Sequence, residues 1–232
     1  GLCSFEGLDF VEIDIPDNVV EIQKGAFQCC EKLKRVTIGN GVTFIEDDTF
    51  SGCRALEELY LGNNLQIIGE GAFRNCSSLT DVQLPNSIIR IKKDAFSGTK
   101  WHKNQQEYPY ILDGWILYDV GAPYLKEDIR GIADRVYSGH ETDNIGTLRI
   151  PNTVVGIGEY AFSSCRGLYG VVIPNSVRYI GVGAFYYTNI SNVSIPQGIE
   201  CISRATFYNC RNLSKVVIPS SVIEIERDAF GM

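Results

Sequence analysis

The chain has 232 residues, a formal net charge of −7, and 44% hydrophobic and 21% charged residues. These proportions are close to globular averages and argue against a disordered or collagen-like chain. The negative balance argues against a broad nucleic-acid surface, which needs clustered positive charge, and no apolar run approaches the roughly 18 residues of a membrane span. We therefore expect no nucleic-acid partner and no membrane insertion.

One aromatic marker recurs along the chain at a nearly constant interval. The dipeptide Ala-Phe or Thr-Phe recurs with spacings of 23, 23, 23, 66, 23, 22 and 23 residues. A fixed period in the twenties is typical of one supersecondary unit stacked on itself. The markers are Phe27, Phe50, Phe73, Phe96, Phe162, Phe185, Phe207 and Phe230.

Each repeat contains two apolar segments before its marker. In one copy Leu33, Val36 and Ile38 form the first segment, whose end alternates in the manner of a strand. Proline and turn residues usually follow, and proline suits a strand end because it cannot donate to a ladder. Val42 and Ile45 then form a second short extended segment. One repeat cannot bury this apolar face alone, so we expect the copies to stack.

The gap of 66 residues holds a worn repeat and an insertion. Residues 129–147 keep the repeat pattern, with Tyr137 in the place of the marker, and residues 100–128 form a divergent insertion. Nine marker aromatics predict about nine coils in a single solenoid over residues 1–232, with the last repeat truncated. Because the chain starts without Met and stops in mid-repeat, we expect a fragment of a longer protein.

The full unit reads Leu-x-x-Val-x-Ile-Pro-x-x-Val-x-x-Ile-x-x-x-Ala-Phe-x-x-Cys-x-x-Leu, most clearly from Leu168 to Asn189. It resembles the BspA-like leucine-rich repeat, also called the Treponema pallidum type, over nearly the whole chain. The resemblance implies a repeat solenoid, mainly β, with a right-handed superhelix of short β-strands and turn or 3-10 segments. It also implies a secreted or cell-surface bacterial protein with an extracellular location.

The resemblance favours one function and leaves two others open. We expect a non-catalytic protein-interaction module, monomeric, that adheres to a host matrix or cell-surface component, to another microbe or to a glycan. The alternative is a structural spacer that presents another domain of a longer chain. A third hypothesis is an appendage that presents substrate to an enzyme domain elsewhere, because fold alone does not fix function.

Five of the eight cysteines occupy one column of the repeat, three residues after the marker. Thr99 and Thr188 replace them in two copies, which favours small buried side chains in reduced form. Occasional disulfides between neighbouring coils remain an alternative, and a zinc site is disfavoured because no Cys-x-x-Cys pair is present. The column holds Cys30, Cys53, Cys76, Cys165 and Cys210, whereas Cys3, Cys29 and Cys201 lie outside it.

No catalytic motif is present in the sequence. The chain has only two histidines, His102 and His140, and lacks a nucleophile elbow, a Walker motif and a dinucleotide fingerprint. We therefore expect no enzyme activity, no cofactor and no metal.

Two surfaces are candidates for partner binding. The first is the outward face of the main strands, where Tyr60 and Gln83 lie, although any solvated face would show similar variety. The second is the insertion, which holds both tryptophans. There Asp-Gly predicts a tight hairpin, and the aromatics either bind a partner or plug the interrupted repeat. The insertion candidates are Trp101, Tyr108, Tyr110, Trp115 and Tyr118.

Overall fold

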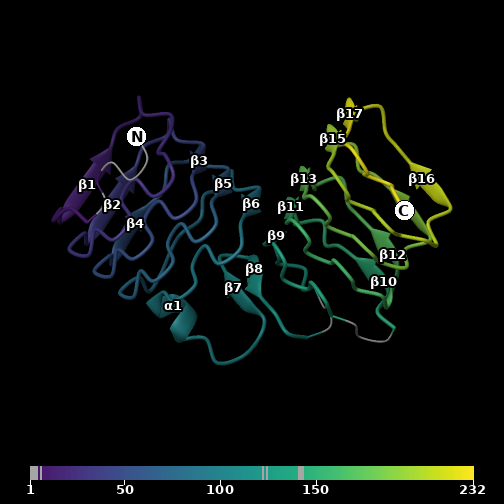
Figure 1. The fold of residues 1–232 in the computed structure, drawn as a ribbon, viewed down its shortest axis with the longest axis horizontal. Helices are drawn as coiled ribbons and strands as arrows, with labels where there is room; N and C mark the ends of the chain where they lie inside the picture. Colours follow the sequence, from purple (N-terminus) through teal and green to yellow (C-terminus); the bar gives the residue numbers. More distant parts are fainter. Residues whose placement is uncertain (1–4, 6, 122, 124, 141–143) are drawn as a thin grey trace. The chain divides into compact units, whose positions relative to one another are not determined.

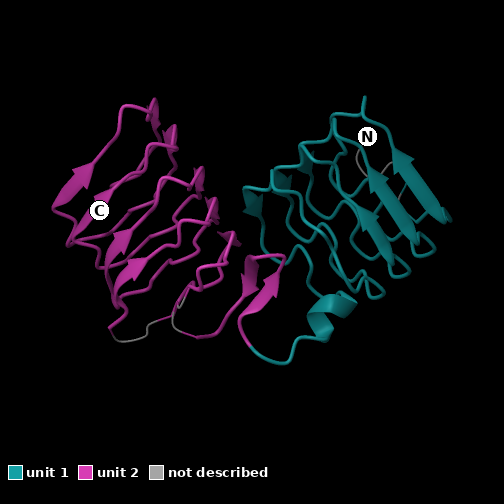
Figure 2. Cartoon of the chain, turned by 180° about the vertical axis from the view of Figure 1, so that it is seen from behind, with its two compact units in different colours: residues 1–107 teal, residues 108–232 magenta. Residues whose placement is uncertain are grey.

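The fold is built from short parallel strands and turns. The computed structural model describes every residue except 1–4, 6, 122, 124 and 141–143. Among these residues the only helix is the four-residue α1 (Lys100–Lys103), so the prediction of a mainly β solenoid with a period of about 23 residues is confirmed (Figure 1). The chain divides into two compact units, residues 1–107 and 108–232 (Figure 2). The single solenoid over residues 1–232 stays a prediction.

Unit 1 contains two three-stranded parallel sheets. Equivalent residues of successive coils pair directly, as Val36 does with Leu59, so the repeat period sets the register of the sheets. The first sheet comprises β1 (Glu12–Ile15), β2 (Arg35–Ile38) and β4 (Glu58–Tyr60), and the second comprises β3 (Phe44–Ile45), β5 (Ile67–Ile68) and β6 (Arg90–Ile91).

Unit 2 has the same parallel pairing between coils, and an antiparallel hairpin precedes it in the chain. The hairpin joins β7 (Tyr110–Leu112) and β8 (Trp115–Tyr118) to a parallel sheet of β9 (Gly131–Ile132), β11 (Gly156–Ile157) and β13 (Tyr179–Ile180). Three further parallel pairs complete the coils. They are β10 (Gly146–Arg149) with β12 (Leu168–Val172), β14 (Asn192–Ser194) with β16 (Lys215–Val217), and β15 (Cys201–Ile202) with β17 (Glu224–Ile225).

The marker aromatics form a stacked column in the core of each unit. From Phe27 to Phe96, neighbouring rings lie 5.2 to 5.5 Å apart and within 12° of parallel. In unit 2 the column runs from Tyr137 to Phe230 with spacings of 5.3 to 5.6 Å. Tyr137 takes the place of a phenylalanine and is fully buried. The coils are also bonded through the backbone here, since the Phe73 N–H donates to the Ala95 carbonyl at 2.8 Å.

Each coil turns sharply on both sides of its marker. The residues two before and two after Phe50 are Asp48 and Gly52, and both have positive φ, at 54° and 79°. Such left-handed positions favour Gly, Asn and Asp. Two of them per coil bend the chain around the buried ring.

Thiols of the cysteine column donate hydrogen bonds to backbone carbonyls of an earlier coil. Cys53 Sγ lies 3.2 Å from the Phe27 carbonyl, and Cys76 Sγ lies 3.2 Å from the Phe50 carbonyl. Thr188 in the same column also donates to a carbonyl, that of Phe185, at 3.0 Å. The described cysteines are all free thiols, whereas Cys3 lies outside the described residues. Each residue of this column therefore supplies the turn with a small, buried hydrogen-bond donor.

We predict that Phe73→Ala lowers the free energy of unfolding by about 3–5 kcal/mol, because it removes a fully buried ring from the stack. Tyr60→Ala, at an exposed aromatic of the same unit, serves as the control and should change it by less than about 0.5 kcal/mol. Urea denaturation of the two variants checks this. Equal midpoints would mean that the aromatic column does not hold the coils together.

We also predict that stability falls as the pH rises above about 8.5. Burial raises the pKa of the Cys53 thiol to about 12, and that of Cys165 likewise. The unfolded chain releases these protons near pH ~8.5. The folded state keeps them, so the free energy of unfolding declines between about pH 8.5 and 12 and is unaffected by these groups at lower pH.

Cys53→Thr is the matched control for this effect, because threonine already fills the same column at Thr99 and Thr188. Urea denaturation at pH 7, 9 and 10 should show a shallower decline in the variant than in the parent chain. If the free energy of unfolding declined equally with pH in both proteins, the buried Cys53 thiol would not contribute to the decline.

Candidate functional site

A polar hollow of about 550 Å³ lies on the strand face of unit 1. Tyr60 and Gln83, predicted from the outward column of the strands, both line it. The full lining is Glu57, Glu58, Leu59, Tyr60, Leu61, Asn63, Asp81, Gln83, Leu84, Pro85 and Asn86. The structure therefore brings the two strand-face candidates into one concave site.

The hollow lies where strand pairing between coils lapses. β4 pairs with β2 on one side, but among the described residues its other side has no strand partner. The next coil passes there as residues 81–83, which keep the repeat pattern in sequence but form no strand. An open strand edge offers backbone donors and acceptors to a partner, as in strand addition by a peptide.

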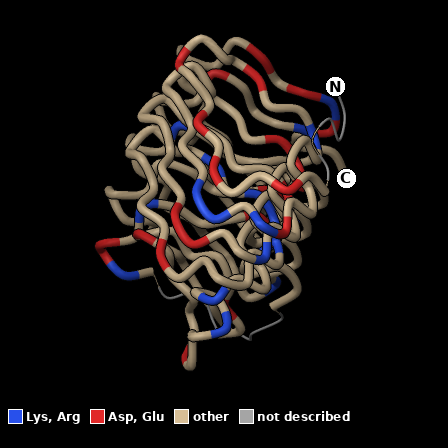
Figure 3. The backbone as a smooth tube through the Cα atoms, turned by 90° about the vertical axis from the view of Figure 1, so that its left-hand side faces the viewer, with Lys and Arg blue, Asp and Glu red and all other residues tan. Residues whose placement is uncertain are grey.

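The hollow is acidic. Glu57, Glu58 and Asp81 line it, and none of them forms an ion pair with a described residue. The nearby cation Arg35 is already held by Glu12, with a 2.6 Å contact between Nη2 and Oε2. Elsewhere along the coils Lys and Arg are interspersed with Asp and Glu (Figure 3).

Tyr60 is the exposed aromatic of this site. About half of its surface is accessible, and its hydroxyl lies 3.4 Å from the Glu58 carboxylate. A tyrosine combines an apolar ring with a polar tip, which suits contact with a protein partner. The hollow therefore combines an aromatic anchor, three carboxylates and an open strand edge.

The hairpin of the insertion has the predicted turn, but Trp115 does not belong to a binding surface. Asp113 and Gly114 both have positive φ, as a primed two-residue turn requires. Trp115 is fully buried, and its ring lies so close to Gly131 that a Cβ there would come within 2.5 Å. The prediction that Trp115 contacts a partner was wrong. It plugs the core at the start of unit 2 because its large apolar surface gains more from burial than from exposure.

The other insertion candidates remain at the surface. Trp101 is half-buried on α1 of unit 1. In unit 2 the exposed Tyr108 stacks on Tyr110 with ring centroids 4.3 Å apart, and Tyr110 meets Tyr118 edge to face at 6.0 Å. A hydrogen bond with Tyr108 raises the pKa of the Tyr110 phenol. These three tyrosines form a cluster, and Trp101 belongs to the other unit.

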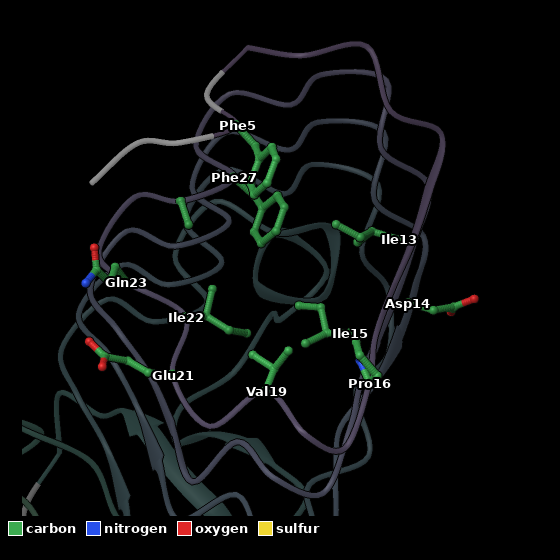
Figure 4. Close-up of a pocket in the computed structure, with 11 residues that line it drawn as sticks. Phe5, Ile13, Asp14, Ile15, Pro16, Val19, Glu21, Ile22, Gln23 and Phe27 are labelled. Atoms are coloured by element: carbon green, nitrogen blue, oxygen red, sulfur yellow. The ribbon is translucent and has the colours of Figure 1, made fainter. Parts of the chain in front are cut away.

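An apolar hollow of about 450 Å³ lies inside the first coil of unit 1. Figure 4 shows the rings of Phe5 and Phe27 above Ile15 and Ile22, which point into the hollow, while Glu21 points away from it. These apolar residues are members of the core columns. The hollow is therefore a part of the apolar core and not the candidate site.

The described residues contain no group of three or more His, Cys, Asp or Glu side chains that could hold a metal ion. The neighbouring carboxylates of Asp47 and Asp48 are paired with cations, with Lys92 Nζ 3.0 Å from Asp47 and Arg74 Nη1 3.5 Å from Asp48. In the part of the chain that is described, no helix is both long and apolar enough to cross a membrane.

The repeat signature is shared with a known family. The family profile described as BspA type leucine rich repeat region matches six copies, over residues 1–106 and 131–232. The chain belongs to the BspA-type leucine-rich repeat family. The resemblance seen in the sequence is thereby confirmed.

Several solved structures are similar to this BspA-type chain. A leucine-rich repeat protein from Bacteroides ovatus ATCC 8483 is 22% identical, with 95% of this chain and 72% of that chain covered and a TM-score of 0.41. A leucine rich cell surface protein from Faecalibacterium prausnitzii A2-165 is 24% identical, with 95% and 70% covered and a TM-score of 0.40. The T. pallidum leucine rich repeat protein is 21% identical, with 93% and 72% covered and a TM-score of 0.37. No curated protein sequence matches the chain.

Sequence reasoning placed Tyr60 and Gln83 on an outward face but missed the hollow between them. Val82 and Leu84 repeat the strand pattern of the other coils, so nothing in that pattern signals that the strand is lost. A second surface was also missed, where Tyr160 and Tyr187 of unit 2 occupy positive-φ turn positions that hold no aromatic residue in other coils. The sequence signal for this second surface was the appearance of tyrosine in turn columns that otherwise lack aromatic residues.

We predict that Gly131→Ala destabilises the protein by about 1–3 kcal/mol, because the added Cβ would collide with the buried Trp115 ring. Gly121→Ala is the control, since a Cβ there would only reach ordinary contact, 3.5 Å from Asp119. Thermal unfolding followed by circular dichroism compares them. Loss of stability in neither variant would place Trp115 outside the core.

Proposed function

We propose that this chain is a non-catalytic protein-interaction module of a secreted or cell-surface bacterial protein, and that its role is adhesion to a host matrix or cell-surface component or to another microbe. Membership of the BspA-type family supports the repeat-module part of this proposal. The observation that carries it is the acidic hollow at the open edge of β4. A solenoid presents such an extended face to partners.

The hollow provides the features that protein recognition uses. The open edge of β4 offers backbone hydrogen bonds, which supply affinity without regard to sequence. Tyr60 offers an aromatic anchor in the lining, and Gln83 offers an amide donor and acceptor. The carboxylates of Glu58 and Asp81 favour a partner segment that carries Lys or Arg.

The test is binding of the purified chain to immobilised matrix proteins, mucins and bacterial surface extracts, by surface plasmon resonance. We predict that Tyr60→Ala weakens binding about tenfold, equal to about 1.4 kcal/mol, because it removes the anchor of the site. Tyr169→Ala is the matched control, as Tyr169 is an equally exposed strand-face tyrosine of unit 2. Its binding should stay within about twofold of the parent chain.

Two other outcomes would contradict the proposal. Binding that survives Tyr60→Ala but is lost in Trp101→Ala or Tyr108→Ala would move the site to the insertion. Binding to no surface component at all would favour the structural spacer, in which the coils only hold another part of a longer chain away from the cell.

A further inference from the structure

A second surface feature lies on the turns of unit 2, away from its strands. Four half-buried tyrosines gather there with two exposed arginines. We call this the Tyr–Arg patch, and its members are Arg135, Tyr160, Arg166, Tyr186, Tyr187 and Tyr208.

The patch is continuous across successive coils. Tyr186 stacks on Tyr208 with centroids 5.5 Å apart and rings within 5° of parallel, and it meets Tyr160 edge to face at 6.4 Å. The Arg135 guanidinium lies 4.7 Å from the centre of the Tyr160 ring, and that of Arg166 lies 5.0 Å from the centre of Tyr187. Each guanidinium lies over a ring, a contact that limits its freedom before it binds a ligand.

The coil does not need these tyrosines for its shape. Tyr160 and Tyr187 have positive φ, at 52° and 60°, a backbone conformation that is unfavourable for bulky side chains. The same two columns hold Gly71 and Asn75 around Phe73 in unit 1. The other coils hold varied residues in these two columns but no other aromatic, so a bulky aromatic ring at positive φ here is a pointer to function.

The polar groups of the patch are not used by the fold. None of the four phenol hydroxyls makes a hydrogen bond to a described residue, and neither Arg135 nor Arg166 forms an ion pair within the described part of the chain. The surface therefore presents two fixed guanidinium forks and four hydroxyl donors. Guanidinium forks match the geometry of carboxylate and sulfate oxygens.

The backbone below the patch is already bonded. The N–H groups of Tyr160, Tyr187 and Ser164 donate to carbonyls of the next coil at 2.9, 2.9 and 2.7 Å. Strand addition by a peptide is thus closed off here, unlike at the edge of β4. Recognition must come from side-chain donors and aromatic ring edges, which suits a chain of sugar rings that carries oxyanions.

We propose that the Tyr–Arg patch binds an anionic polysaccharide through the sulfate or carboxylate groups of its sugars. The charge distribution supports this placement. Residues 1–107 carry eleven Lys and Arg against sixteen Asp and Glu, whereas residues 108–232 carry ten against twelve. A polyanion is therefore repelled less by unit 2 than by unit 1.

The test measures binding of dextran sulfate to the full chain by fluorescence anisotropy at about 50 and 150 mM salt. Arg135→Gln with Arg166→Gln should weaken binding about tenfold and flatten its salt dependence. The matched control is Arg149→Gln with Lys215→Gln, which removes the same charge from exposed strand positions of unit 2 and should change the affinity less than about twofold. Neutral dextran of the same length should not bind.

Tyr187→Gly separates binding from folding. Glycine is already present in this column at Gly52 and Gly98, so the variant should be at least as stable as the parent chain while it binds dextran sulfate more weakly. The proposal is overturned if dextran sulfate does not bind, if the control pair weakens binding as much as the arginine pair, or if neutral dextran binds equally well. Stronger binding of polyglutamate than of dextran sulfate would also overturn it, and would point to an acidic protein partner.

Discussion

The fold depends on the contact between one buried aromatic ring and the rings of the coils before and after it. No coil can cover both faces of its own phenylalanine, so each needs its neighbours. The backbone reinforces this at the same place, as when the Phe50 N–H donates to the Ala72 carbonyl at 2.8 Å. The ring column and the bonds beside it hold successive coils in register, and the strand side of each coil is then free to vary.

The acidic hollow illustrates this freedom. The coil that contains Asp81 and Gln83 forms no strand beside β4, yet it stays attached on the marker side. There the Phe73 and Asn75 N–H groups donate to the following coil at 2.8 Å each. A binding site can therefore open on one side of a coil while the opposite side carries the stability.

Much of the fold followed from the sequence because its columns are set by burial. The place of Tyr137 in the ring stack, the Cys and Thr column and the Asp113–Gly114 turn all reflect local chemistry that a repeat pattern exposes. The burial of Trp115 did not follow, since it depends on the space left by Gly131, sixteen residues away in sequence. The hollow was equally hidden, because apolar periodicity reports which side chains are buried and not whether two backbones pair.

The turn after the cysteine column has a further consequence. The coil from Phe185 to Phe207 is one residue shorter than its neighbours, and the missing residue falls between Thr188 and Ile190. The rings still stack at 5.4 Å, and Ile190 is fully buried in the place of the usual leucine. A deletion at this turn is thus absorbed locally and leaves the frame of later coils intact. The length of individual coils in such an array can therefore change one coil at a time. Its surface can diversify in this way while the packing of its core is kept.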